Sequence, residues 1–352
     1  MKTPPTIKPY TSQNKRPLWS VMIPVYNCAH LLQKALDSVL MQDPGADSMQ
    51  IEVVDDASDD DDIRAIVEKI GKGRIDYFRQ PQNVGSLRNF ETCINRSRGH
   101  LVHLLHGDDR LRKGYYEKIG SLFGQYPHVG AAFCNYDFID EKGQIMWEND
   151  GGIKEEGVLQ NWLKQIASKQ MLQYCTITIK REVYEKLGGY YGVNYGEDWE
   201  MWTRIAASYE MAYTPEILAE YRMHQGSLSH HSFKSAQNIR DIEWVIDTIQ
   251  KMVPENDRDW IKKAAQKNYA YYALTIANSL WHQTGNKKIT KMQVKGALKL
   301  HTDYDMLLQV AKIYTKMLIG RTGIWIYLIC KIISDFEQPF RATNHVFLNL
   351  PC

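Results

Sequence analysis

Residues 100–109 of the chain read His100-Leu101-Val102-His103-Leu104-Leu105-His106-Gly107-Asp108-Asp109. The apolar run predicts a strand buried in a sheet, with the two aspartates following its carboxyl end. That edge is where open α/β sheets hold their ligands. Two adjacent carboxylates repel each other, and a divalent cation is the natural way to keep both ionised. The alternative is a polar turn that simply closes the strand.

Three earlier apolar runs also lead into polar residues. The predicted strands are 18–24, 51–56, 74–78 and the run from His100, and segments with helical spacing separate them at 31–40, 63–70 and after Gly85. This alternation predicts an α/β fold with a mostly parallel sheet covered by helices on both faces. Because parallel strands end at one edge, the polar residues that follow them are expected to converge there.

The pattern changes after Gly114. The sequence predicts helices at 115–126, 157–169 and 181–187, strands at 129–134, 175–179 and 217–221, and a hairpin turn at 140–143. A second polar cluster, 195–204, reads as a helix that opens with acidic residues. Beyond Phe233 the strand signals stop, and helices are predicted at 239–252, 259–284 and 288–320. The predicted domains are a flexible N-terminus (1–16), an α/β domain (17–233) and a helical C-terminal region (234–352).

Charge divides unevenly between these parts. The whole chain carries a formal net charge of +2, and residues 234–352 hold 17 Lys and Arg against 10 Asp and Glu. Lysines at 288, 291, 295 and 299 lie close to one helical face. A solvated face is the ordinary interpretation. The alternative is peripheral membrane contact with anionic lipid headgroups, helped by the aromatic-rich segment 325–329.

Composition excludes several classes of protein. The net charge gives no general attraction to nucleic acid. The six scattered cysteines contain no Cys-x-x-Cys pair, so neither a zinc site nor a disulfide framework is predicted, and a reducing cytoplasm fits best. The N-terminus lacks a signal-peptide apolar core, and no apolar run approaches the ~20 residues of a membrane-spanning helix. We therefore expect a cytoplasmic protein.

The polar clusters together suit an anionic ligand. Carboxylates around a cation, with arginine and histidine nearby, are appropriate for a phosphorylated ligand, and a metal would neutralise a departing diphosphate. A further carboxylate away from the metal would be free to act as a general base. No Gly-x-Gly-x-x-Gly follows the first strand and no P-loop occurs, which argues against a dinucleotide-binding or P-loop domain.

The motifs resemble those of the inverting family 2 glycosyltransferases with the GT-A fold. The resemblance covers roughly residues 18–230, and its motifs occur in the family's order. They are Ser20–Asn27, Val53–Asp59, Asn83-Val84-Gly85, Arg88-Asn89, Asp108-Asp109 and Glu197-Asp198-Trp199.

On the donor side, the resemblance implies a nucleoside pocket lined by Pro24, Tyr26 and Asp56. Tyr26 would stack on the base, and Asp56 would accept a hydrogen bond from a base N–H. Arg88 would lie near the base or the phosphates, and Asp108 would touch the ribose or the donor sugar. Tyr26 as a surface turn residue, and Asp56 as a helix cap, are the alternatives.

The resemblance also implies the metal and catalytic groups. Asp109 would ligate Mg²⁺ or Mn²⁺, with His224 as a metal or diphosphate contact, although a lone histidine is often structural. Arg222 would flank the diphosphate, and Glu197 would contact the donor. Asp198 matches the base that deprotonates the acceptor hydroxyl. His106 stands where the family usually has Asp, which leaves the donor-sugar contact open.

The expected function is that of a metal-dependent inverting hexosyltransferase. It would move sugar from a nucleotide-diphospho-sugar, with UDP favoured, to a saccharide or lipid-linked saccharide in surface polysaccharide or glycoconjugate synthesis. One alternative is a sugar nucleotidyltransferase, but the glycine-rich basic loop of that class is missing after the first strand. The other is a non-catalytic nucleotide-sugar-binding or scaffold protein, against which the intact Glu197-Asp198 pair argues.

Overall fold

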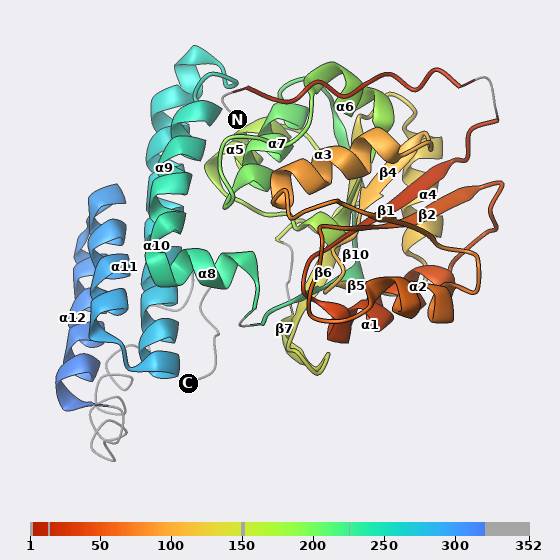
Figure 1. Cartoon of the computed structure of the whole chain (residues 1–352). Coiled ribbons are helices and arrows are strands. Elements are labelled where there is room, and N and C mark those ends of the chain that lie inside the picture. Colours follow the sequence, from red (N-terminus) through yellow and green to blue (C-terminus); the bar gives the residue numbers. More distant parts are fainter. Residues whose placement is uncertain (1–2, 13–14, 149–151, 225, 321–352) are drawn as a thin grey trace. The chain divides into compact units, whose positions relative to one another are not determined.

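The computed structural model describes residues 3–12, 15–148, 152–224 and 226–320 (Figure 1). Contacts divide the chain into two compact units, one made of residues 1–166 and 170–224 and the other of the remainder. The first unit carries the sheet, and the second is helical. The domain boundary predicted at 233/234 falls inside helix α8 (Leu228–Ser235) of the second unit.

A mixed sheet is the centre of the first unit. Its strand order is β3-β2-β1-β4-β9-β6-β10-β5, with β7 on β6 and β8 on β10. The first four are mutually parallel, β9 runs antiparallel to β4 and β6, and β6 and β10 are parallel. The strands are β1 (Trp19–Val25), β2 (Met49–Asp55), β3 (Asp76–Arg79), β4 (Leu101–Leu104), β5 (Arg110–Leu111), β6 (Ala131–Ile139), β7 (Ile145–Glu148), β8 (Gly157–Val158), β9 (Ile177–Lys180) and β10 (Met211–Arg222).

Helices cover both faces of this sheet. Helices α1 (Ala29–Leu40), α2 (Ile63–Gly71) and α4 (Tyr115–Gln125) share one apolar core with alternate residues of β1. Helix α3 (Ser86–Arg96) packs on β1, β2 and β4 from the other side (Figure 1). Successive strand side chains point to opposite faces, so a strand covered on both sides is largely apolar. The predicted fold class, an α/β sheet flanked by helices with a C-terminal helical region, is confirmed.

Some element bounds differ from the prediction. The segment predicted as one helix at 157–169 forms β8 and then α5 (Trp162–Ser168), and a 3₁₀ turn at Tyr174–Thr176 precedes β9. Helix α6 (Arg181–Leu187) matches its prediction, and α7 (Glu197–Ala206) opens with the acidic residues as expected. The hairpin turn is also confirmed, since Gly143 N–H donates to Asp140 O at 2.9 Å between the antiparallel β6 and β7.

The helical unit comprises α8, α9 (Gln237–Ile249), α10 (Arg258–Thr284), α11 (Lys287–Leu300) and α12 (Tyr304–Ile319). The single helix predicted at 288–320 is two helices, because Asp303 caps α12 by accepting the Met306 N–H at 3.0 Å. Buried amides join the helices, with Asn238 Nδ2 3.0 Å from the Tyr269 hydroxyl. No helix among the described residues is long and apolar enough to span a membrane. The predicted segment 325–329 lies outside the described residues.

Candidate active site

The loop after β1 is tied to the loop after β2. Asn27 donates from Nδ2 to Asp59 Oδ1 at 2.7 Å, and its Oδ1 accepts the Asp59 N–H at 2.9 Å. Its backbone N–H also donates to Ser58 Oγ at 3.0 Å. Asn27 takes a left-handed backbone (φ 49°), which asparagine tolerates better than most residues. Tyr26, just before it, is 49% exposed and available for stacking, whereas Pro24 is buried in β1.

Asp56 organises the approach to α3. Its two carboxylate oxygens accept the N–H groups of Val84 and Gly85 at 2.8 and 3.0 Å, and its own N–H extends the sheet by donating to Val25 O. Burial raises the pKa of Asp56, and the two N–H donors oppose that effect. Arg88, in the first turn of α3, is exposed and pairs with Glu91 at 2.6 Å. Asp56 therefore connects the β2 end to the helix that carries Arg88.

The turn after β4 is fastened directly to β1. Leu105 N–H donates to Met22 O at 3.0 Å, and Gly107 N–H donates to Pro24 O at 3.2 Å. A Cβ at Gly107 would lie 2.9 Å from Val25 Cγ2 and 3.1 Å from Cys28 Sγ. Only glycine fits this close approach without displacing its neighbours. The β1 attachment therefore fixes where Asp108 and Asp109 leave the sheet.

The two aspartates have different surroundings. Asp109 is buried; its Oδ1 accepts the Arg222 N–H at 2.8 Å, and its Oδ2 is buried without a hydrogen-bond partner. Burial and the neighbouring Asp108 charge raise the pKa of Asp109 well above its usual range. Asp108 Oδ2 accepts from His224 Nε2 at 2.9 Å. Burial raises the pKa of Asp108, but this hydrogen bond and the nearby His106 outweigh burial and lower it.

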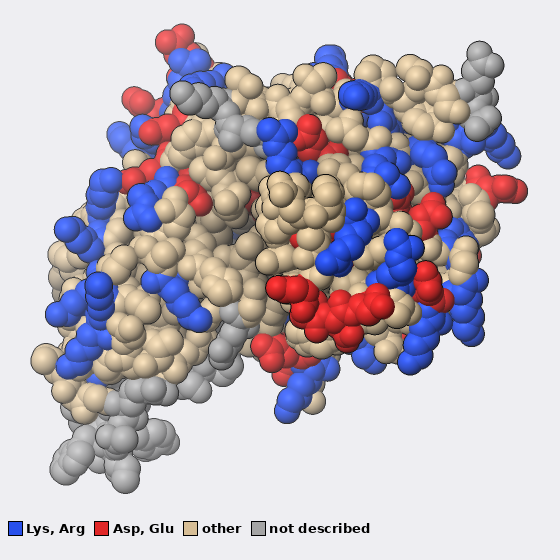
Figure 2. Space-filling view, viewed as in Figure 1, with Lys and Arg blue, Asp and Glu red and all other residues tan. Residues whose placement is uncertain are grey.

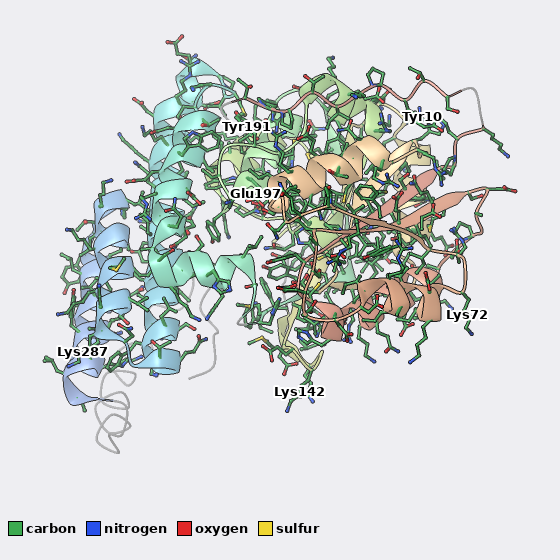
Figure 3. The ribbon with its side chains drawn as sticks, in the orientation of Figure 1. Tyr10, Lys72, Lys142, Tyr191, Glu197 and Lys287 are labelled. Carbon is green, nitrogen blue, oxygen red and sulfur yellow. The ribbon has the colours of Figure 1, made fainter. Side chains whose placement is uncertain are left out.

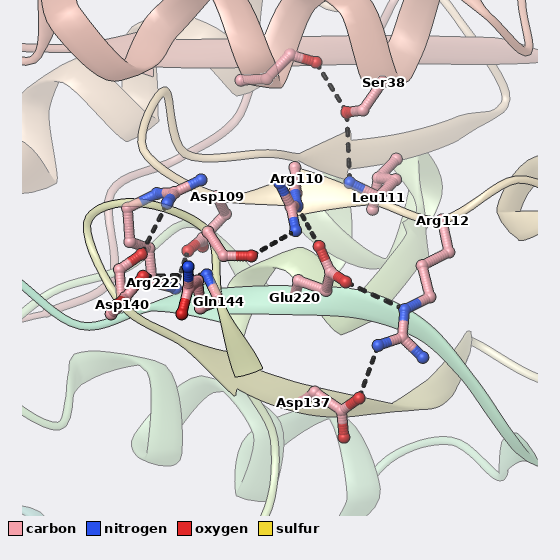
Figure 4. A network of polar contacts seen from close by, with 12 residues as sticks. Ser38, Asp109, Arg110, Leu111, Arg112, Asp137, Asp140, Gln144, Glu220 and Arg222 are labelled. Atoms are coloured by element: carbon pink, nitrogen blue, oxygen red, sulfur yellow. Dashed lines mark hydrogen bonds and ion pairs between the residues drawn. The ribbon is translucent and has the colours of Figure 1, made fainter. Parts of the chain in front are cut away.

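Arg222, at the end of β10, also holds the turn in place (Figure 4). Its buried guanidinium donates from Nε to Asp108 O at 2.6 Å, and from Nη1 to the carbonyls of Asp140 and Glu141 at 2.7 and 3.1 Å. The guanidinium is thus engaged with the backbone of the turn and of the β6–β7 hairpin. This arrangement suits a residue that positions Asp108 and Asp109.

A row of ion pairs links the neighbouring strands in the same view. Arg110 pairs with Glu220, which also accepts from Arg112 Nε at 3.0 Å, and Arg112 Nη2 reaches Asp137 Oδ2 at 2.5 Å (Figure 4). These partners alternate in sign, so the partly buried arginines compensate the buried carboxylates of Glu220 and Asp137. These ion pairs stabilise the pairing of β5, β10 and β6, the strands next to the turn and to Arg222.

Asp198 lies in the first turn of α7. Its Oδ1 accepts the Trp199 N–H at 2.7 Å, and its Oδ2 accepts from Gln170 Nε2 at 2.5 Å. Burial raises the pKa of Asp198 to about 6, although both hydrogen bonds favour the ionised form. Its side chain stays partly exposed. A carboxylate that is accessible and has a pKa near neutrality is suited to accepting a proton.

Glu197, beside it, faces the interior at the start of α7 (Figure 3). It accepts from the Tyr174 hydroxyl at 3.1 Å. The Tyr174 ring lies 4.3 Å from the His106 ring, and Tyr174 therefore joins α7 to the carboxylate turn. Trp199 and Trp202 are fully buried and belong to the core.

Two residues of this arrangement, Gln170 and Tyr174, were not predicted. Both lie in the irregular segment between α5 and β9, where no periodicity and no motif identifies them. An aromatic residue directly before a β-branched strand was the only signal for Tyr174.

A divalent cation fits the residues of the turn. One donor atom from each of His106, Asp108 and Asp109 lies within 4.8 Å of the others. Asp109 Oδ2 and His106 Nε2 are both buried without a partner, so each lacks an interaction that a cation would supply. The donor set of two carboxylates and an imidazole is chemically suited to such an ion.

The sequence and the fold both have known counterparts. Residues 20–188 match the family model described as glycosyl transferase family 2. An uncharacterised glycosyltransferase of Mycoplasma genitalium is 32% identical over 119 residues, which are 33% of this chain and 40% of that relative.

Two solved structures are similar in fold. Staphylococcus aureus TarS 1–349 in complex with UDP-GlcNAc has a TM-score of 0.61 at 14% identity, covering 83% of this chain and 81% of that one. The mannosyltransferase PcManGT of Pyrobaculum calidifontis, in complex with GDP-Man and Mn²⁺, has a TM-score of 0.54 at 19% identity, covering 90% and 91%. At these identities the likeness concerns the fold.

Proposed function

The chain belongs to glycosyl transferase family 2 through residues 20–188, and on that premise we propose that it is a metal-dependent, inverting hexosyltransferase. The donor is a nucleotide-diphospho-sugar, with UDP favoured, and the acceptor is a saccharide or lipid-linked saccharide in surface polysaccharide or glycoconjugate synthesis. The complexes of TarS with UDP-GlcNAc and of PcManGT with GDP-Man support this class of donor. Residues 17–233 form the proposed catalytic domain.

The observation that carries the proposal is the junction at Tyr174. Its ring lies against His106 of the carboxylate turn, and its hydroxyl donates to Glu197 beside Asp198. A candidate base and a candidate metal-binding turn therefore share one connecting side chain. This is the pairing that sugar transfer needs, because one group must accept a proton while another receives the departing diphosphate.

In the proposed reaction, Asp198 takes the proton of the acceptor hydroxyl. The acceptor oxygen bonds to the anomeric carbon from the face opposite the diphosphate, and the carbon–oxygen bond to the diphosphate breaks with its electron pair remaining on the nucleotide. Configuration therefore inverts. A cation bound by Asp109 would supply charge neutralisation for the leaving diphosphate. Tyr26 stacks on the base, Pro24 and Asp56 line the nucleoside pocket, and Arg88 lies near the base or the phosphates.

The remaining donor-side residues have supporting roles. Asp108 contacts the ribose or donor sugar and is oriented by His224, whose Nε2 donates to it. Arg222 holds the backbone of the turn by hydrogen bonds and so positions the groups that surround the diphosphate. Glu197 accepts a hydrogen bond from Tyr174 and so orients that residue.

The test is the substitution Asp198→Asn. It should abolish transfer while leaving the affinity for UDP nearly unchanged, as measured by calorimetry. Glu182→Gln, a change at an exposed carboxylate of α6, is the matched control and should retain activity. An equal loss of nucleotide affinity in Asp198→Asn would make Asp198 a binding residue instead of the base.

We also propose that the protein is cytoplasmic and touches the inner face of the membrane through its helical unit. Lysines are exposed along α11, and they are the basic side chains that Figure 2 shows over α11 and α12. Exposed apolar side chains accompany them on α12, among them Leu307 at 49% and Leu318 at 84%. Apolar area next to basic charge is the combination that binds anionic lipid surfaces.

A further inference from the structure

His106 is held in one orientation by aromatic neighbours. Its ring stacks on Phe90, with ring centroids 5.2 Å apart and ring planes inclined by 17°. The centroid of the Tyr174 ring lies 4.3 Å from that of His106. Both neighbours are themselves buried. Such packing leaves little rotamer freedom, so the direction in which the ring nitrogens point is fixed by the fold.

The Nε2 atom of this ring is buried, and among the described residues it has no hydrogen-bond partner. A neutral imidazole is the form in which histidine binds metals.

A second orphaned atom lies in the same turn. Asp109 is 1% exposed, and its Oδ2 is also buried without a partner. Donor atoms of His106, Asp108 and Asp109 lie within 4.8 Å of one another. Asp109 Oδ2 and His106 Nε2 are both electron-pair donors, so they cannot form a hydrogen bond with each other unless a proton lies between them. One cation between them would satisfy both.

We propose that His106 is itself a ligand of the cation, through Nε2, beside carboxylate oxygens of Asp109 and Asp108. The inference rests on the metal dependence in the proposed function and goes beyond it by replacing an all-oxygen site with a mixed nitrogen and oxygen site. His224 is a weaker candidate for this role, because its Nε2 is already engaged with Asp108 Oδ2 at 2.9 Å.

This ligand set determines which cations bind well. Imidazole nitrogen favours transition-metal ions, whereas Mg²⁺ prefers carboxylates and water. The protein should therefore bind Mn²⁺ and Co²⁺ in strong preference to Mg²⁺. Aspartate in place of His106 would add a charge and an oxygen donor, and would shift the preference toward Mg²⁺.

The first experiment observes the ligand directly and requires no turnover. Mn²⁺ is added to the full chain with UDP, and pulsed electron paramagnetic resonance records the ¹⁴N modulation from a directly bound imidazole. We expect this modulation in the wild type, its loss in His106→Asp, and its retention in His224→Asn. Modulation that persists in His106→Asp but vanishes in His224→Asn would assign the ligand to His224 and overturn the proposal.

The second experiment measures affinity. Free Mn²⁺ is titrated by its solution resonance signal, with Mg²⁺ as competitor. His106→Asp should narrow the preference for Mn²⁺ over Mg²⁺ by about tenfold or more, and His30→Asn, a change on the exposed part of α1, should not alter it. His106→Gln is a second variant should His106→Asp fail to fold.

The outcomes separate the two proposals. If Asp109→Asn abolishes Mn²⁺ binding while both His106 variants keep the wild-type affinity and selectivity, the metal-dependent transferase stands and His106 is not a ligand. If the wild type binds no Mn²⁺ even with UDP, both the ligand assignment and the metal dependence of the proposed function fail.

Discussion

Gln170 Nε2 donates a 2.5 Å hydrogen bond to Asp198 Oδ2. The amide is itself oriented, because Gln170 Oε1 accepts the Leu172 N–H at 3.1 Å and thereby turns the NH₂ group toward the carboxylate. With Trp199 N–H on Oδ1, each oxygen of Asp198 has one donor. The candidate base is thus held from two sides, by the next residue in the chain and by Gln170 from a distant segment.

The first prediction concerns pH. Burial raises the pKa of Asp198 to about 6, and only the ionised carboxylate can accept the acceptor proton. Transfer should therefore be maximal above pH 7 and fall about tenfold for each unit below pH 6. Initial rates measured at saturating donor between pH 5 and 8.5 test this fall in rate, the acid limb of the pH profile. A rate that is flat down to pH 5 would contradict the assignment of Asp198 as the base.

The second prediction concerns Gln170. Its hydrogen bond favours the ionised form of Asp198, so Gln170→Leu should raise the pKa and move the acid limb to higher pH by about one unit, with nucleotide affinity unchanged. Gln165→Leu, an exposed change in α5, is the control. Gln170→Glu should shift the limb further, because a second carboxylate repels the charge. A lower rate with an unmoved limb would indicate a merely structural role.

The third prediction concerns metal removal. EDTA should abolish transfer, added Mn²⁺ should restore it, and Asp109→Ala should remain inactive with Mn²⁺ present. The reason is that Asp109 Oδ2 is buried and unpartnered, so its ionised form depends on a cation. Atomic absorption of the treated protein confirms that the ion has been removed. Full activity in chelator would exclude the metal role.

The fourth prediction concerns Tyr26, the residue that we propose stacks on the base. Tyr26 is half exposed and makes little contribution to the core. Tyr26→Ala should therefore leave the melting temperature nearly unchanged but weaken UDP binding by about 1–3 kcal/mol, the usual contribution of an aromatic platform. Tyr26→Phe should bind like the wild type. If alanine and phenylalanine bind UDP equally well, Tyr26 does not stack on the base.

The fifth prediction tests membrane contact. The full chain should co-sediment with vesicles containing phosphatidylserine and not with neutral vesicles. Replacing Lys288, Lys291 and Lys295 with Gln should weaken this binding by about 1 kcal/mol for each lysine. Lys69→Gln with Lys72→Gln on α2 is the control. Equal binding by the α11 variant and the wild type would remove α11 from the contact.

Much of the fold could be predicted because its signals are local. The runs that form β1, β2 and β4 are buried on both faces, and a strand of that kind is largely apolar. Helix α6 and the start of α7 followed from capping and periodicity. The prediction was wrong where a helical sequence pattern is overridden by strand pairing. Gly157–Val158 pairs with β10 instead of starting a helix.

The candidate site, like the fold, has residues that the sequence indicates and contacts that it does not. The sequence alone singled out Asp109 and Asp198 as candidates, because the motifs and their order are properties of the chain itself. Only the tertiary structure decided what surrounds them, including Gln170 on Asp198, Tyr174 between His106 and Glu197, and the Arg222 guanidinium on the backbone of the turn. These contacts join segments with no shared periodicity. They exist because sheet pairing and core packing bring distant residues to one edge, which no local pattern encodes.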